Sequence, residues 1–302
     1  MLSSQKSLFI ILTVLLFVRI SPGQEIPDFD QAGAFHFLEK QCAFGPRNPG
    51  SEGYKKCLQY LVEELKRNAD QVQEQPFLAT LPGSGKAITL TNIIATYGQA
   101  EPAIMFCAHW DTRPWADSDP NPANRSRPIS GANDGASGVA ILLELSRILK
   151  KNPPPRKVML VLFDGEDSGL HNQNDTWCLG SRYFAQHFQA LSYPEYAVLI
   201  DLVGDRDLHI PKEGYSEKYV GDLVTEIWNT AHKLGLSAFD DRTMYYVIDD
   251  HLELLKVGIR AIDIIDFDYP YWHTLNDTPD KCSAESLDVI GTLLLHLIYE
   301  SN

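Results

Sequence analysis

Short apolar runs that end in acidic residues or histidine constrain this chain more than any other feature of its sequence. The runs at residues 158–163, 197–200 and 261–265 are continuous or nearly so, as is typical of strands buried on both faces of a sheet. Segments with helical spacing of apolar residues lie between or after these runs. The alternation predicts an α/β fold: a single globular domain with a central mixed, mostly parallel sheet and helices on both faces.

The remaining elements follow from hydrophobic periodicity and turn residues. Two further strands are expected near residues 87–97 and 102–108. Helices are expected near residues 31–43, 51–68, 135–150, 178–190, 216–234 and 284–300. No connecting segment is long enough to require a second domain.

The first 23 residues predict a secretory signal peptide. Lys6 precedes an apolar run, and small residues follow at 21–23, which is the layout of a cleaved signal. The alternative is an uncleaved N-terminal anchor. Cleavage would leave a catalytic domain over residues 24–302 that is secreted or periplasmic and has no further membrane segment.

The net charge of the chain argues against one class of partner, nucleic acids. The 302 residues include 26 Lys and Arg against 40 Asp and Glu, a formal net charge of -14. A surface that tracks nucleic-acid phosphates must be basic, so this balance argues against a nucleic-acid partner. The five cysteines are an odd number, and the sequence does not pair them.

Polar residues follow each predicted strand at its carboxyl end. The members of this set are His109, Asp111, Asp134, Asp164, Glu166, Asp167, Asp201 and His273. In open α/β sheets the carboxyl ends of the strands gather ligand-binding residues at one rim. So many carboxylates would repel one another without a cation or shared protons. His, Asp and Glu without thiolates indicate zinc, although an Asp in the position of Asp134, taken alone, is more often a helix N-cap.

The ordered motifs resemble the zinc aminopeptidase-like peptidase family. They are HWD (109–111), GANDGASGVA (131–140), FDGED (163–167), LIDLVGD (199–205) and YWHTLNDT (271–278). Two features are similar to its glutaminyl cyclase branch. One is the sequence Asp249-Asp250-His251 ahead of an apolar segment, and the other is Trp272 directly before His273. The resemblance implies a single α/β domain of the zinc aminopeptidase-like fold.

The resemblance also implies roles for individual residues. The three implied zinc ligands are Asp134, Asp167 and His273. Glu166 would be the catalytic acid/base, with Asp201 and Asp249 as carboxyls that hydrogen-bond with it. The family usually has Glu where this chain has Asp167, so this ligand is one methylene shorter. Trp272 would line the substrate pocket, and Trp110 and Trp115 are further pocket candidates.

A glutaminyl cyclase converts the N-terminal glutamine of a peptide or protein to pyroglutamate and releases ammonia. This reading implies one zinc per chain, and we expect a monomer. The alternative is a secreted aminopeptidase of the same fold with two zincs, for which His109 and Asp201 would supply the second-metal ligands. A non-catalytic binding protein is a third class, but such proteins usually lose ligands and none is missing here.

Overall fold

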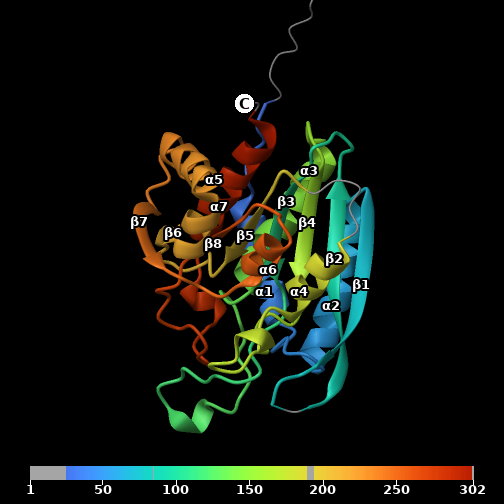
Figure 1. Cartoon of the computed structure of the whole chain (residues 1–302), viewed down its shortest axis with the longest axis vertical. Helices are drawn as coiled ribbons and strands as arrows, with labels where there is room; N and C mark the ends of the chain where they lie inside the picture. Colours follow the sequence, from blue (N-terminus) through green and yellow to red (C-terminus); the bar gives the residue numbers. More distant parts are fainter. Residues whose placement is uncertain (1–24, 84, 189–193, 301–302) are drawn as a thin grey trace, which may run out of the picture.

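The computed structural model describes residues 25–300 except 84 and 189–193 (Figure 1). The predicted signal peptide, residues 1–23, lies outside the described residues. Within the described part of the chain, no helix is both long and apolar enough to cross a membrane. All five cysteines are free thiols.

A six-stranded mixed sheet forms the centre of the molecule. Its order is β1 (Gln71–Thr80), β2 (Ala87–Tyr97), β4 (Val158–Phe163), β3 (Ile104–His109), β5 (Tyr196–Asp201) and β8 (Ala261–Ile265). The strands β4, β3, β5 and β8 are parallel, whereas β2 runs antiparallel to both of its neighbours. The predicted α/β sheet is therefore confirmed.

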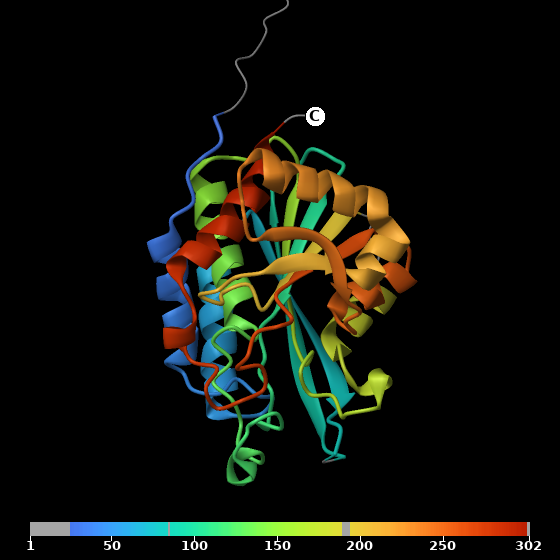
Figure 2. The same cartoon turned by 90° about the vertical axis from the view of Figure 1, so that its left-hand side faces the viewer.

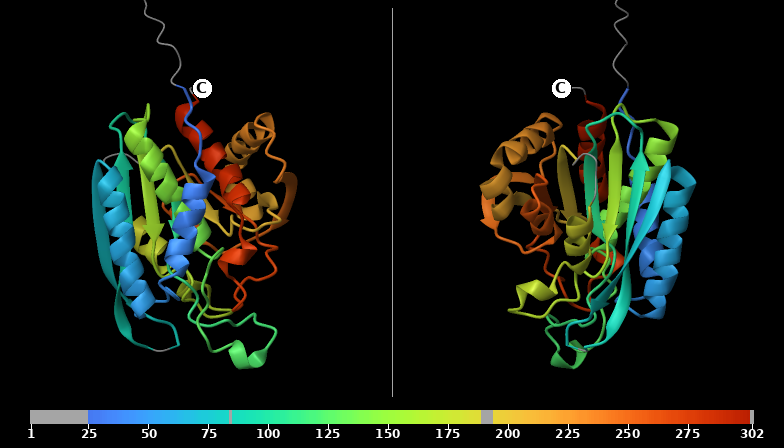
Figure 3. Two further views of the ribbon diagram at one scale, coloured as in Figure 1. Left: turned by 180° about the vertical axis from the view of Figure 1, so that it is seen from behind. Right: turned by 45° about the vertical axis from the view of Figure 1, so that its right-hand side comes forward.

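Helices cover both faces of the sheet (Figure 2). One face carries α1 (Gln31–Cys42), α2 (Glu52–Asn68), α3 (Ala136–Lys151) and α7 (Ala284–Tyr299). Among these, α3 contacts the other three, and Figure 3 (left) shows the four from behind. The opposite face carries α4 (Leu179–His187) and α6 (Asp250–Lys256).

A smaller two-stranded sheet lies beside the β8 edge. It pairs β6 (Ile210–Glu213) with β7 (Phe239–Tyr245) in parallel, and α5 (Gly214–Lys233) connects them. Helix α5 packs on β7 and β8. The described residues also form three short 3-10 helices: Pro122–Asn124, Asn174–Thr176 and Pro279–Lys281.

The central strands are buried on both faces because their side chains alternate between two apolar cores. In β3, Ile104, Phe106 and Ala108 face the α3 side, whereas Met105 and Cys107 face α4 and α6. A strand with no solvent-facing side must be apolar throughout, which is why these strands read as continuous apolar runs.

Candidate metal centre and catalytic pocket

A cavity of about 260 Å³ opens beyond the carboxyl ends of the parallel strands. The functional residues lie at the carboxyl ends of the strands or in the segments that follow them: His109 ends β3 and Asp201 ends β5, whereas Glu166 and Asp167 follow β4. Six of the predicted site residues line this cavity: Asp134, Glu166, Asp201, Asp249, Trp272 and His273.

The three predicted zinc ligands converge at the base of this cavity. His273 Nε2 lies 3.1 Å from Asp167 Oδ1 and 3.5 Å from Asp134 Oδ2. Ligands at about 2.0–2.1 Å from a tetrahedral zinc are about 3.4 Å apart, so the spacing fits the ion. Asp134 Oδ2 and both carboxylate oxygens of Asp167 are buried and accept no hydrogen bond in the described structure. Buried carboxylate oxygens without a hydrogen-bond partner need another source of stabilisation, and a bound cation would supply it.

A second group of potential ligands adjoins the first. His109 Nε2 lies 3.2 Å from Asp134 Oδ1 and 3.2 Å from Asp201 Oδ1. Asp134 therefore faces both groups, one through each carboxylate oxygen. On spacing alone, the second group fits an ion as well as the first does.

Asp117 and Arg113 contact the group of Asp134, Asp167 and His273 on the side away from the potential metal position. Asp117 Oδ1 lies 3.3 Å from His273 Nδ1, the ring nitrogen that faces away from the ligand group. The Arg113 guanidinium donates to both oxygens of Asp117, at 3.1 and 2.6 Å, and lies 3.5 Å from Asp167 Oδ1. Such contacts fix the orientation of a metal-binding imidazole. The sequence analysis missed both residues, which lie in a proline-rich loop without periodic pattern.

Asp111 and Asp277 hold the backbone that carries the ligands. Asp111 accepts hydrogen bonds from the N–H groups of Glu166 and Asp167, at 3.0 and 3.4 Å. Asp277 accepts from the N–H of Asp134 at 3.2 Å and from its neighbour Asn133 at 2.8 Å. Asp111 belongs to the HWD motif and Asp277 to the YWHTLNDT motif. The sequence alone did not predict that these two side chains accept hydrogen bonds from the backbone of the ligand residues.

Glu166 and Asp249 form a buried acidic group with the Cys178 thiol. One ligand atom from each of the three lies within 4.8 Å of the others, and Cys178 Sγ lies 3.6 Å from Glu166 Oε1. Burial raises the pKa of Glu166 well above its ordinary value, and Asp249 raises it further against an opposing effect of His109. Burial and then the charge of Asp201 raise the pKa of Asp249 in the same way. Both effects favour the protonated form of these carboxyls.

The tryptophans have three different environments. Trp272 lines the cavity, and its ring stacks on His273 with centroids 3.7 Å apart. Trp110 is fully buried in the core, where Nε1 donates to the Thr91 carbonyl at 3.2 Å, so its predicted pocket role is corrected. Trp115 does not line the cavity either; its ring packs on the Arg113 guanidinium. Trp177 also lines the cavity.

Known proteins are similar to this chain over most of its length. Residues 92–298 match the family model described as peptidase family M28. A glutaminyl-peptide cyclotransferase of Bos taurus is 26% identical over 84% of this chain and 78% of that protein. A glutaminyl cyclase structure from Bacteroides thetaiotaomicron is 34% identical, covers 92% of this chain and 100% of its own, and has a TM-score of 0.88. A leucine aminopeptidase precursor from the same organism has the same identity and TM-score, and covers 92% of this chain and 99% of its own.

Proposed function

Because the chain belongs to peptidase family M28, a zinc-dependent family, we propose that it is a glutaminyl cyclase. It would convert the N-terminal glutamine of peptides and proteins to pyroglutamate and release ammonia. The observation that carries the proposal is the placement of the Asp249 carboxyl within 4.8 Å of Glu166 and in the same cavity as Asp201. The similarity to glutaminyl cyclases adds to it.

Asp134, Asp167 and His273 would hold a zinc ion, which would supply a Lewis acid for the γ-carbonyl of the glutamine. Glu166 takes a proton from the attacking α-amine and returns it to the departing ammonia. Asp201 and Asp249 share the proton that keeps three adjoining carboxyls from all being charged. Ring closure is intramolecular, so the pocket accelerates it by holding the glutamine folded against Trp272.

An aminopeptidase with two zincs is the second candidate function. It is favoured by the spacing of His109, Asp134 and Asp201, which fits a second ion. It is also favoured by the similarity to a leucine aminopeptidase precursor. In that case Glu166 would accept a proton from an attacking water rather than from an amine.

Product analysis with synthetic peptides separates the two functions. A peptide with N-terminal glutamine should lose the mass of one ammonia and keep every peptide bond, whereas the same peptide with glutamine at its second position should stay unchanged. Free leucine released from a Leu-initiated peptide, without ammonia from the Gln-initiated one, would replace the cyclase by the aminopeptidase.

Location and assembly belong to the same proposal. The catalytic domain, residues 24–302, would act after removal of residues 1–23, in the secretory space or periplasm, as a monomer. N-terminal sequencing and light scattering of the exported protein test both statements. A retained leader or a stable dimer would contradict the corresponding one.

A further inference from the structure

Exposed apolar side chains gather beside the mouth of the catalytic cavity. Five large hydrophobic residues of the described chain are exposed, and four belong to α5, β7 or the segment between β7 and α6: Tyr219, Met244, Tyr246 and Ile248. Exposed apolar side chains scatter singly on most surfaces, whereas a local concentration marks a binding surface.

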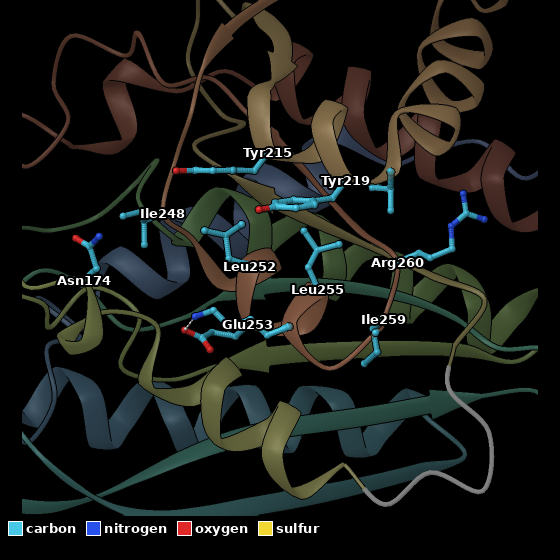
Figure 4. Close-up of a pocket in the computed structure, with 12 residues that line it drawn as sticks. Asn174, Tyr215, Tyr219, Ile248, Leu252, Glu253, Leu255, Ile259 and Arg260 are labelled. Carbon is cyan, nitrogen blue, oxygen red and sulfur yellow. Dashed lines mark hydrogen bonds and ion pairs between the residues drawn. The ribbon is translucent and has the colours of Figure 1, made fainter.

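A second cavity, of about 620 Å³, lies between α5 and α6 at this place. In Figure 4, Tyr215 and Tyr219 form one wall and Leu252 and Leu255 face them. We call this cavity the α5–α6 groove. Its walls are apolar and aromatic, so it suits apolar side chains.

The α5–α6 groove is continuous with the catalytic cavity. Asn174 and Ile248 line both, and Figure 4 shows them together at one end of the groove. Tyr246, which lines the catalytic cavity, packs edge-on against Tyr215 with ring centroids 5.1 Å apart. Tyr215 in turn stacks with Tyr219 at 6.3 Å. A row of three tyrosine rings thus leads from the catalytic cavity into the groove.

The backbone fixes the first ring of this row. A Cβ atom at Gly214 would lie 2.7 Å from the Tyr246 ring, so only glycine allows the ring to rest against the start of α5. The Tyr246 side chain is nevertheless 63% exposed. The ring therefore rests against the start of α5 and is open to a ligand.

The charged residues of the α5–α6 groove are paired within the chain. Glu253 accepts from Arg182 at 3.0 Å and from Lys256 at 2.8 Å. Arg260, at the far end from Asn174 and Ile248, pairs with Asp222 at 2.7 Å (Figure 4). With these charges compensated, the apolar walls decide what the groove binds.

We propose that the α5–α6 groove binds the residues that follow the N-terminal glutamine of the substrate, and selects peptides in which these residues are apolar or aromatic. This inference rests on the proposed function. A peptide whose first residue occupies the small cavity must leave through its mouth, and the tyrosine row begins there. In an extended peptide the second and later side chains would then lie along Tyr246, Tyr215 and Tyr219.

Steady-state kinetics on two pentapeptides test the proposal. Both begin with glutamine, and phenylalanine and leucine follow in one whereas glycines follow in the other. The wild-type holoenzyme should have a higher kcat/KM for the apolar peptide. Tyr219→Ala should lower this preference roughly tenfold, mainly through KM, which is the lower end of what an apolar pocket contact contributes to discrimination. Leu78→Ala, which removes an exposed side chain on β1, is the matched control and should keep the preference.

Calorimetric binding of the same peptides to zinc-loaded Glu166→Gln protein removes the dependence on turnover. Tighter binding of the apolar peptide that Tyr219→Ala abolishes supports the groove, even if no ammonia is released and the proposed function fails. Equal binding of both peptides, or a preference that survives Tyr219→Ala, overturns the groove and leaves the proposed function standing. A dimer that Tyr219→Ala dissociates, with peptide preference unchanged, also overturns it.

Discussion

The metal centre has two halves that share Asp134: the His273 half, with Asp167, and the His109 half, with Asp201. They differ in the charged residues that lie next to the ligands. In the His273 half, the ligands contact Asp117 and Arg113, so a cation of the protein already lies beside the carboxylates. In the His109 half, Asp201 lines the same cavity as Asp249 and raises its pKa, and Asp111 lies 3.6 Å from His109 Nδ1.

This difference indicates how the same spacing of ligand atoms can suit a zinc ion in one half and a shared proton in the other. Both halves have the distances that an ion requires, but the His109 half holds an additional carboxyl near Asp201. Like charges at this range are relieved by a shared proton as well as by a cation. For the proposed cyclase we therefore assign zinc to the His273 half and a proton to the group of Asp201, Asp249 and Glu166.

Loss of a ligand from the zinc half should have the largest effect. His273→Ala should abolish zinc binding and lower kcat/KM more than about 10³-fold, because Lewis-acid catalysis contributes several kcal/mol. Metal analysis after gel filtration, beside the ammonia-release assay, measures both. Full zinc occupancy in this variant would remove His273 from the ligand set.

Loss of the acid/base Glu166 should leave zinc binding unchanged. Glu166→Gln should keep its zinc and lower kcat by about 10²–10³-fold, since the amide cannot accept the amine proton. The comparison of zinc content with kcat distinguishes this variant from His273→Ala. Unchanged kcat would assign the proton transfer to another residue.

Weakening the support of the zinc half should have an intermediate effect. Asp117→Asn removes the charge that faces His273 Nδ1 and should weaken zinc binding about 10–100-fold. Competition with a chelator measures the affinity, and Asp175→Asn in the exposed 3-10 helix Asn174–Thr176 is the control. Equal zinc affinity in the two variants would mean that Asp117 does not orient the imidazole.

Removal of the additional carboxyl should make the halves more alike. Asp249→Ala removes the carboxyl with which Asp201 is proposed to share a proton, and so lowers the pKa of Asp201 and frees it as a ligand. The His109 half should then bind a second zinc about tenfold more tightly, an effect of roughly one pKa unit. Zinc titration by calorimetry reads this second site directly. A second site no tighter than in the wild type would show that Asp249 does not decide the number of ions.

A core substitution should leave both halves intact. Trp110→Phe removes the hydrogen bond to the Thr91 carbonyl and some buried volume, and should lower the free energy of unfolding by about 1–3 kcal/mol. Urea unfolding of the zinc-loaded protein measures this. KM should stay the same, and an increase in KM would return Trp110 to the substrate pocket.

The sequence predicted the parts of the fold whose pattern is set by burial. Strands β4, β5 and β8 are apolar because both faces are covered, and this alone revealed them. It did not reveal β1, an edge strand with mostly exposed or half-buried residues, nor β6 and β7, which lie outside the main sheet. Helix α6 has only seven residues, too few for a periodic signal.

In the site, sequence order and strand topology placed the residues that come straight after strands. Asp117 and Arg113 come from a long loop, where residue spacing carries no information on which side chains meet. The burial of Trp110, by contrast, does follow from the sequence pattern. Residues 104, 106, 108 and 110 all face the same core, so continued alternation through β3 predicts a buried Trp110.

Titration of metal-free protein with zinc, with ammonia release followed at each addition, tests the difference between the two halves most directly. We expect activity to reach its plateau at about one zinc per chain, with no further rise when more is added. Activity that needs a second zinc per chain to reach its plateau would contradict the assignment of a proton, rather than an ion, to the His109 half.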